Sequence, residues 1–276
     1  MRDGSTGRAD GGTPRTAAPA HRLTSVLRPA AGPGPRVVVF PHAGGGALRY
    51  REVLAPLPPE VEIVGVTLPG REHRAALAPR TTLARVVADL TAELAEPTEP
   101  RTAAERPTVL YGHSLGALLA LLVAHAGRVR CDALVVSCSM PGRRAFPRPE
   151  LLGGREGLSA VLARHGLSPD ALDDPSLSPG RSALAHDLAL AQEALIAVDG
   201  LRADVALTAL AGDQDPLVPS AVLPLWARLT GGAFRSRVIE AGHFLPFTAA
   251  GQEAVLEEVG AFLRLRPAGP RAGLTS

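Results

Sequence analysis

Residues 109–117 read Val109-Leu110-Tyr111-Gly112-His113-Ser114-Leu115-Gly116-Ala117, and the interpretation of the whole chain starts from them. A short apolar run enters the pattern Gly-x-Ser-x-Gly and continues into an apolar helical stretch. In a nucleophile elbow, a sharp strand-to-helix turn strains the serine backbone, and the glycines leave room where strand and helix nearly touch. The pattern alone is weak, because a chain with 29 glycines can form it by chance. The apolar run before the pattern and the helical stretch after it strengthen the interpretation as a nucleophile elbow.

Strand and helix patterns alternate on both sides of the elbow. Residues 83–94 place apolar side chains at helical spacing, and Thr82 can cap that helix. Further helical patterns lie around 221–229 and at the end of the chain, where Val255, Val259 and Phe262 share a face. Apolar strand patterns occupy residues 36–40, 61–68, 132–139, 205–210 and 235–239. The alternation predicts an α/β fold in which a mostly parallel central sheet is flanked by helices on both faces.

The same reading gives the domain organisation. We expect one α/β domain over residues 36–266, preceded by a disordered N-terminal leader (1–35) and followed by a flexible tail (267–276). Residues 141–200 interrupt the alternation with prolines, glycines and helical runs at 158–165 and 183–197. We interpret this insertion as a helical lid over the active site, and a helical subdomain without a gating role is the alternative.

Composition excludes several classes of protein. The 276 residues carry a net charge of +2 from interspersed charges and contain 3% aromatic residues, which disfavours nucleic-acid binding. The longest apolar run, residues 115–126, is shorter than the roughly 20 residues that span a bilayer. No signal-peptide pattern opens the chain, so we expect a cytoplasmic protein. Cys131 and Cys138 are interpreted as two buried, reduced thiols, and no metal site is expected.

Three residues form a candidate catalytic set. Ser114, Asp215 and His243 each follow a predicted strand, and such loops lie along one edge of a parallel sheet. His186 is a rival base, but it lies in the insertion. Asp213 competes for the acid, and Asp215 is preferred because a proline and an apolar stretch follow it where the chain leaves the sheet.

These side chains suit acyl transfer. A serine hydroxyl becomes nucleophilic when an imidazole takes its proton, and a carboxylate fixes the imidazole tautomer. The glycine-rich segment 41–46 lacks the Gly-Lys-Ser/Thr of a phosphate-binding loop, so we expect it to contribute to an oxyanion hole. The backbone N–H groups of Ala43 and Leu115 are the predicted donors. The sequence does not identify substrate-binding side chains.

Five motifs follow one another along the chain: Phe40–Gly45, Leu68–Glu72, Gly112–Ala117, Gly212–Val218 and Gly242–Phe244. They resemble the successive signatures of the type II thioesterases, which are free-standing editing enzymes of polyketide synthases and nonribosomal peptide synthetases. The resemblance runs from about Val37 to Phe262. It implies an α/β-hydrolase fold and hydrolysis of acyl groups on the phosphopantetheine arm of acyl or peptidyl carrier proteins, with no cofactor besides that arm. The first two motifs, Phe40–Gly45 and Leu68–Glu72, are specific to this branch.

Two departures leave the acyl preference open. Members commonly carry Leu-Arg-Ala-Asp followed by aromatics in the lid, where this chain has Leu184-Ala185-His186-Asp187-Leu188. Arg49 and Tyr50 stand where paired aromatics are frequent. The alternatives are a carboxylesterase or acyltransferase for free small esters or thioesters, and a carrier-binding module with incidental hydrolysis. Nothing in the sequence indicates the oligomeric state.

Overall fold

The computed structural model describes residues 21–32, 34–95, 106–146, 154–163 and 165–264. Within this part of the chain, seven strands form a sheet in the order β1-β3-β2-β4-β5-β6-β7. Strand β1 runs antiparallel to β3 at one edge, and all other neighbours are parallel. The strands are β1 (Thr24–Arg28), β2 (Arg36–Phe40), β3 (Glu62–Val66), β4 (Thr108–His113), β5 (Ala133–Ser137), β6 (Ala206–Gly212) and β7 (Phe234–Ile239).

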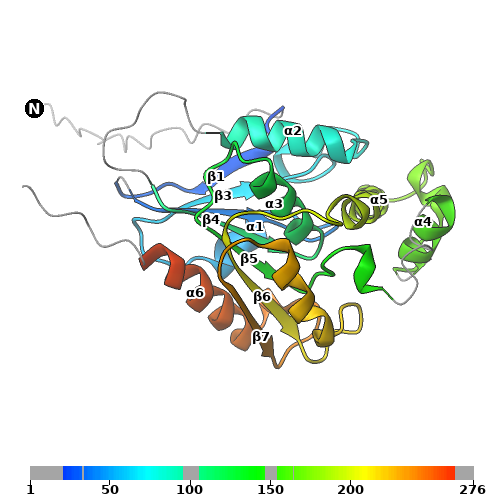
Figure 1. The fold of residues 1–276 in the computed structure, drawn as a ribbon. Helices are drawn as coiled ribbons and strands as arrows, with labels where there is room; N and C mark the ends of the chain where they lie inside the picture. The colour runs from blue at the N-terminus through cyan, green and yellow to red at the C-terminus, as the bar shows by residue number, and fades with distance from the viewer. Residues whose placement is uncertain (1–20, 33, 96–105, 147–153, 164, 265–276) are drawn as a thin grey trace, which may run out of the picture.

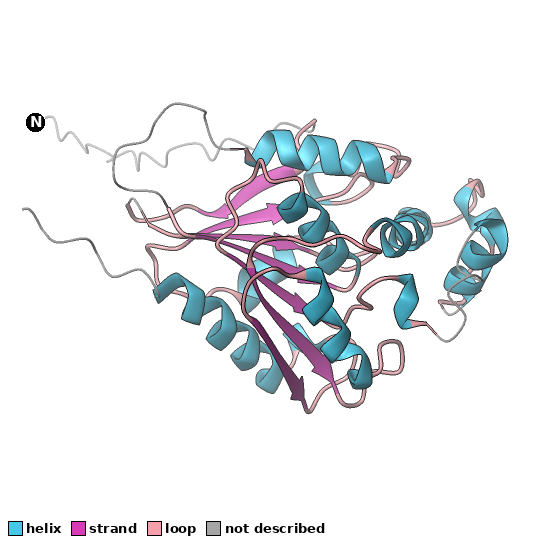
Figure 2. Cartoon of the chain, viewed as in Figure 1, coloured by secondary structure: helices cyan, strands magenta, loops and turns pink. Residues whose placement is uncertain are grey.

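Helices cover both faces of the sheet, and the helices Gly154–Ala163 and Pro179–Ala197 lie beyond the edge toward which the parallel strands point (Figures 1 and 2). The α-helices are α1 (Leu48–Val53), α2 (Leu83–Leu94), α3 (Leu115–His125), α4 (Gly154–Ala163), α5 (Pro179–Ala197) and α6 (Ala249–Arg264). Short 3₁₀ helices are η1 (Glu72–Arg74), η2 (Arg143–Ala145), η4 (Pro169–Leu172), η5 (Ser220–Leu229) and η6 (Leu245–Phe247). The predicted α/β architecture is confirmed.

Strand β2 shows why its residues form a continuous apolar run. Successive side chains of a strand point to opposite faces. Val37 and Val39 enter the core that α1 and α6 cover, whereas Val38 and Phe40 enter the core that α2 and α3 cover. A strand with helices on both faces therefore needs apolar residues at every position.

The helix predicted after Thr82 is confirmed as α2. The Thr82 hydroxyl accepts a hydrogen bond from the Arg85 N–H at 3.3 Å, which is the expected N-cap contact. Of the two helical runs predicted in the insertion, the run at 158–165 overlaps α4, which ends at Ala163, and the run at 183–197 lies in α5. The described residues of 141–200 contain no strand. The insertion is therefore helical, as expected.

The predicted disordered leader is wrong at its C-terminal end, because Thr24–Arg28 form β1. Contacts far along the chain stabilise this edge strand. The Glu93 carboxylate accepts hydrogen bonds from the N–H groups of Leu23 and Thr24 at 2.8 and 2.9 Å. The Arg28 guanidinium donates to carbonyl oxygens of the loop before β3. Residues 1–20 and the tail at 267–276 lie outside the described residues.

The helix predicted around 221–229 is a 3₁₀ helix, η5, rather than an α-helix. Pro224 lies inside it, and proline has no N–H to donate to a preceding turn. Its apolar side chains are nevertheless placed as expected, since Val222, Leu223 and Trp226 are buried in the core that α2 and α3 cover.

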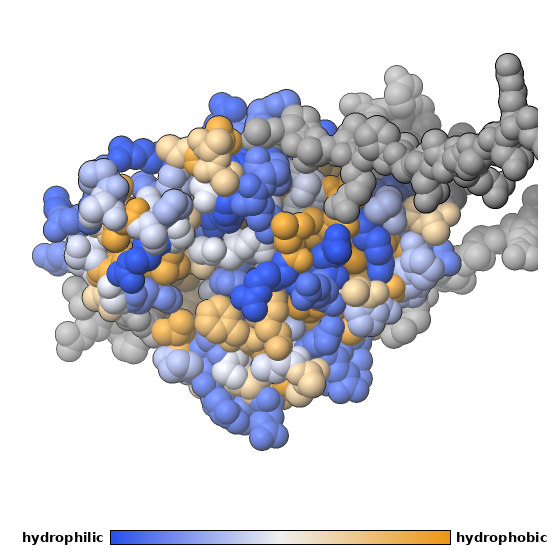
Figure 3. Space-filling view, turned by 180° about the vertical axis from the view of Figure 1, so that it is seen from behind, coloured by the Kyte–Doolittle hydropathy of each residue, from blue (hydrophilic) through white to orange (hydrophobic). Residues whose placement is uncertain are grey.

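The rear face of the molecule mixes hydrophilic and hydrophobic residues, with hydrophobic groups gathered near its centre and charged ones between them (Figure 3). In the part of the chain that the structure describes, no helix combines the length and apolarity needed to cross a bilayer. Both cysteines are unpaired, as predicted; Cys138 is buried, and Cys131 is half-buried.

Candidate active site

Ser114 lies on a sharp turn between β4 and α3. Its backbone φ of 55° and ψ of −119° are strained for a residue other than glycine. A Cβ on Gly112 would lie 2.5 Å from the Cα of Ala117, and a Cβ on Gly116 would collide with the backbone oxygen of Phe40 in β2. The turn predicted from Gly-x-Ser-x-Gly is confirmed, and close backbone contacts explain both glycines.

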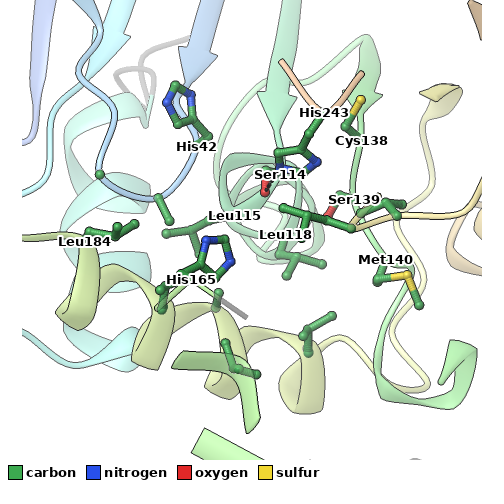
Figure 4. Close-up of a pocket in the computed structure, with 18 of the residues that line it drawn as sticks. His42, Ser114, Leu115, Leu118, Cys138, Ser139, Met140, His165, Leu184 and His243 are labelled. Carbon is green, nitrogen blue, oxygen red and sulfur yellow. Dashed lines mark hydrogen bonds between the residues drawn. The ribbon is translucent and has the colours of Figure 1, made fainter. Parts of the chain in front are cut away.

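The structure brings Ser114, Asp215 and His243 together (Figure 4 shows His243 beside Ser114). His243 Nε2 lies 3.2 Å from the Ser114 hydroxyl oxygen, and His243 Nδ1 lies 2.8 Å from Asp215 Oδ2. The three residues follow β4, β6 and β7, so the sheet edge assembles them as the alternation predicted. The distances match those of a nucleophile, a base and the carboxylate that orients the base.

Asp215 is held by more than His243. Its Oδ1 accepts hydrogen bonds from the N–H groups of Leu217 and Val218 at 2.8 and 3.0 Å. Burial acts to raise the pKa of Asp215, but the hydrogen bond and charge of His243, together with these N–H groups, lower the pKa below its usual value. The ionised carboxylate accepts the Nδ1–H of His243, which leaves Nε2 unprotonated toward Ser114.

The rival residues lie elsewhere. The Asp213 carboxylate accepts a hydrogen bond from the Ala241 N–H at 3.1 Å and is exposed. His186 Nε2 lies 3.0 Å from the carbonyl oxygen of Leu172, within the insertion. Neither side chain lines the pocket that contains Ser114. The geometry therefore supports the preference for Asp215 and His243.

The two expected oxyanion donors belong to this pocket. Ala43 and Leu115 line it together with Ser114. Leu115 is the first residue of α3, and the first N–H groups of a helix have no partner inside the helix. Ala43 belongs to the glycine-rich loop after β2. Their location fits the oxyanion role that the sequence suggested, and the role itself is a proposal.

A cavity of about 550 Å³ opens beside Ser114. Its wall is predominantly aliphatic, and the sheet domain and the insertion both contribute to it (Figure 4). The sequence did not identify substrate-binding residues, and the structure supplies these candidates: Leu118, Met140, Val161, Leu184, Leu188, Ala191 and Leu195.

Two further histidines, for which the sequence suggested no role, lie near His243: the centroid of the His113 ring is 5.4 Å from that of the His243 ring, and the centroid of the His42 ring is 5.5 Å from that of His113. His42 Nδ1 lies 2.8 Å from the Tyr50 hydroxyl, and His113 Nδ1 lies 2.9 Å from the Ser137 hydroxyl. Burial, followed by positive charge nearby, lowers the pKa of His42 to about 4 and that of His113 well below its usual value. His42 lies in the motif Phe40–Gly45 and His113 in the motif Gly112–Ala117, so their places in these motifs could have indicated that they lie near the site.

Cys138 lies beside Asp215 and His243. Cys138, Asp215 and His243 place one potential ligand atom each within 4.8 Å of one another. Burial raises the pKa of Cys138 to about 12, so its thiol stays protonated, whereas metal ligands need a thiolate. The hydrogen bond between Asp215 and His243 already occupies the other two groups. The donor set fits acid–base chemistry better than metal binding.

The departure at residues 49–50 also has a structural consequence. Tyr50 is buried and contacts His42, as described above, whereas Arg49 is exposed and stacks its guanidinium 4.5 Å from the centre of the Phe247 ring. A cation therefore covers an aromatic ring where the resemblance led us to expect paired aromatics.

A mostly parallel sheet with a serine elbow after a central strand, followed by acid and base loops after later strands, defines the α/β-hydrolase class. Residues 35–263 match the family model described as a thioesterase domain. The chain belongs to the thioesterase family.

Curated relatives agree with this family. Thioesterase PikA5 of Streptomyces venezuelae is 32% identical over 231 residues, which cover 79% of this chain and 78% of that protein. A Streptomyces griseus protein named "Probable cadicidin biosynthesis thioesterase" is 31% identical over 261 residues, which cover 88% of this chain and 66% of that protein. The match therefore spans just under two thirds of the cadicidin protein.

Solved structures give the same result. The type II thioesterase BorB from the borrelidin biosynthetic cluster superposes with a TM-score of 0.68 at 27% identity, covering 90% of this chain and 98% of BorB. RedJ, the thioesterase from the prodiginine pathway of Streptomyces coelicolor, has a TM-score of 0.62 at 28% identity, covering 90% and 96%. The resemblance to type II thioesterases that the motifs indicated is confirmed.

Proposed function

We propose that this chain hydrolyses acyl thioesters carried on the phosphopantetheine arm of acyl or peptidyl carrier proteins, as an editing enzyme for a polyketide or nonribosomal peptide synthase. The observation that carries the proposal is the hydrogen-bonded series from Ser114 through His243 to Asp215, which opens on an aliphatic cavity. Family membership selects a thioester as the reacting group.

The chemistry follows from the contacts. His243 Nε2 takes the proton of the Ser114 hydroxyl while the oxygen attacks the thioester carbonyl, and Asp215 stabilises the imidazolium that forms. The N–H groups of Ala43 and Leu115 donate to the oxyanion. The intermediate collapses to an acyl-enzyme as the thiol leaves with a proton from His243. Water, activated by the same imidazole, then releases the acid. The substrate brings the phosphopantetheine, so the chain needs no cofactor of its own.

The relatives support a carrier-bound substrate. BorB comes from the borrelidin cluster and RedJ from the prodiginine pathway. A narrow arm that delivers an acyl chain also suits a cavity lined by aliphatic side chains. The carrier partner belongs to the proposal, and the cytoplasmic location stays a prediction.

The direct test is Ser114→Ala assayed on an acyl-loaded carrier protein, with product and remaining acyl-carrier quantified by mass spectrometry. We expect kcat to fall by a factor on the order of 10⁶, because the three residues act as a unit. Two matched variants test which carboxylate orients His243. Asp215→Asn should lower kcat by about 10⁴, whereas Asp213→Asn should leave kcat near the wild-type value. Retention of most activity in Ser114→Ala would refute the proposal.

The choice of substrate needs a second comparison. We expect kcat/KM to be higher for acyl-carrier thioesters than for oxygen esters of the same acyl chain. A clear preference for the oxygen esters would favour a carboxylesterase. Transfer of the acyl group to an added alcohol or amine, with little free acid, would favour an acyltransferase.

A further inference from the structure

Three segments that are far apart in the sequence meet at one carboxylate. Asp187 in α5 accepts two hydrogen bonds from the Arg71 guanidinium, from Nη1 to Oδ2 at 2.5 Å and from Nη2 to Oδ1 at 2.8 Å. The N–H of Gly44 donates to the same Oδ2 at 2.7 Å. Arg71 Nη1 also donates to the carbonyl oxygen of Gly45 at 3.1 Å. The insertion, the loop after β3 and the glycine-rich loop are thus joined.

This junction is buried, and removing two charged side chains from water costs free energy. The side chains of Arg71 and Asp187 are 10% and 2% exposed. Burial raises the pKa of Asp187, and the hydrogen bonds and charge of Arg71 oppose that rise. Because buried ion pairs contribute little net stability compared with well-packed apolar residues, a gain in stability alone does not explain this one. The hydrogen bonds to Asp187 do fix the orientation of the Arg71 guanidinium and of the Gly44 N–H.

The residue after Arg71 holds the other end of the glycine-rich loop. Glu72 Oε1 accepts a hydrogen bond from the Leu48 N–H at 2.8 Å, and Oε2 accepts one from the Thr67 hydroxyl at 2.8 Å. A Cβ on Gly46 would collide with the Glu72 carboxylate. The loop therefore lies against three charged side chains, those of Arg71, Glu72 and Asp187, and Gly46 allows the close approach of Glu72.

We propose that Asp187, together with Arg71, is a positioning residue that sets the direction of the Ala43 N–H in the oxyanion hole. Gly44 N belongs to the peptide unit that begins at Ala43, so a hydrogen bond that fixes this unit restricts the backbone of Ala43. Asp187 lies one position before Leu188, which lines the cavity. The helix turn that contacts the acyl chain therefore also anchors the loop that stabilises the oxyanion. This inference rests on the proposed function.

The test is Asp187→Asn, which loses the charge and presents an amide N–H to Arg71. We expect kcat to fall about 10- to 100-fold with KM changed less than about threefold, because a misplaced oxyanion donor affects mainly the transition state. The factor should be the same for short and long acyl chains, since the defect lies at the carbonyl. A loss that grows with chain length would overturn the proposal and indicate a role in shaping the cavity.

Two further variants separate positioning from stability. Asp199→Asn is the matched control, because Asp199 is a buried carboxylate in the same insertion that pairs with Arg143 at 2.6 Å, away from the glycine-rich loop. Its kcat should stay near wild type. The charge-free double variant Arg71→Met/Asp187→Leu should have a melting temperature closer to that of the wild type than Asp187→Asn has. Its kcat should nevertheless stay low, because the Gly44 N–H lacks its acceptor. Recovery of kcat together with the melting temperature would overturn the proposal.

The rate at which a fluorophosphonate labels Ser114 gives a readout independent of the carrier. Asp187→Asn should slow the labelling about 10-fold or more, because phosphonylation also develops an oxyanion. If the wild-type enzyme labels normally but leaves acyl-carriers intact, the proposed function fails and the positioning role is still measured. Labelling and p-nitrophenyl ester hydrolysis at wild-type rates in Asp187→Asn would overturn the inference alone.

Discussion

At the scale of single residues, two further histidines, His42 and His113, lie close to His243. The rings of His113 and His243 have centroids 5.4 Å apart, and those of His42 and His113 are 5.5 Å apart. The lowered pKa values keep His42 and His113 uncharged near neutral pH. In the proposed mechanism, the positive charge that forms on His243 therefore meets no added charge from these two rings.

These histidines predict a loss of stability in acid. In the unfolded chain a histidine has a pKa of about 6.5, so between about pH 6.5 and about pH 4 the unfolded state binds more protons than the folded state. The free energy of unfolding must then fall as the pH falls through this window. Each pKa unit of difference corresponds to about 1.4 kcal/mol. Urea unfolding at about pH 7.5 and about pH 5 measures the loss.

Substitution identifies the source of that pH dependence. His42→Gln should show a smaller loss between the two pH values, whatever its stability at neutral pH, because it removes one of the depressed groups. An unchanged loss in His42→Gln would contradict the prediction.

At the scale of elements, the elbow depends on contacts between backbones. A methyl group on Gly116 would overlap the carbonyl oxygens of Phe40 and Pro41, so Gly116→Ala must push α3 away from β2. We expect it to lower the free energy of unfolding by about 1–3 kcal/mol and to lower kcat by moving Ser114. Gly180→Ala is the control for stability, because nothing lies within 4 Å of its added Cβ and it lies in α5. Equal stability of the two variants in denaturant would contradict the prediction.

The elements also show how far local sequence decides structure. Strand β2 and helix α2 were predictable because each has a local pattern, a continuous apolar run in one and a capped amphipathic stretch in the other. Strand β1 was not, because Glu93 and the loop before β3 supply its contacts from outside. Asp215 could be selected over Asp213 from the proline that follows it, whereas the N–H groups that hold its carboxylate required the fold.

At the scale of the molecule, the cavity lies between the sheet domain and the insertion. Leu118 comes from α3, Met140 from the loop after β5, and a stripe of residues spaced three or four apart comes from α5: Gly180, Leu184, Leu188, Ala191 and Leu195. This stripe was present in the sequence but could not be recognised, because α5 also buries apolar residues on other faces, such as Ala185 and Ala194. Periodicity finds an amphipathic helix and does not select among several buried faces.

Because α5 forms part of the cavity wall, one substitution in this helix should change the preference for acyl-chain length. Ala191→Phe adds an aromatic ring to the cavity wall, so the ratio of kcat/KM for a long acyl thioester to that for a short one should fall at least about 10-fold, since each excluded methylene is worth about 1–3 kcal/mol. Ala197→Phe, on an exposed position of the same helix, should leave the ratio unchanged. Because Ser114 and the glycine-rich loop are untouched, hydrolysis of the short substrate should persist. An unchanged ratio in Ala191→Phe would place the acyl chain outside this cavity.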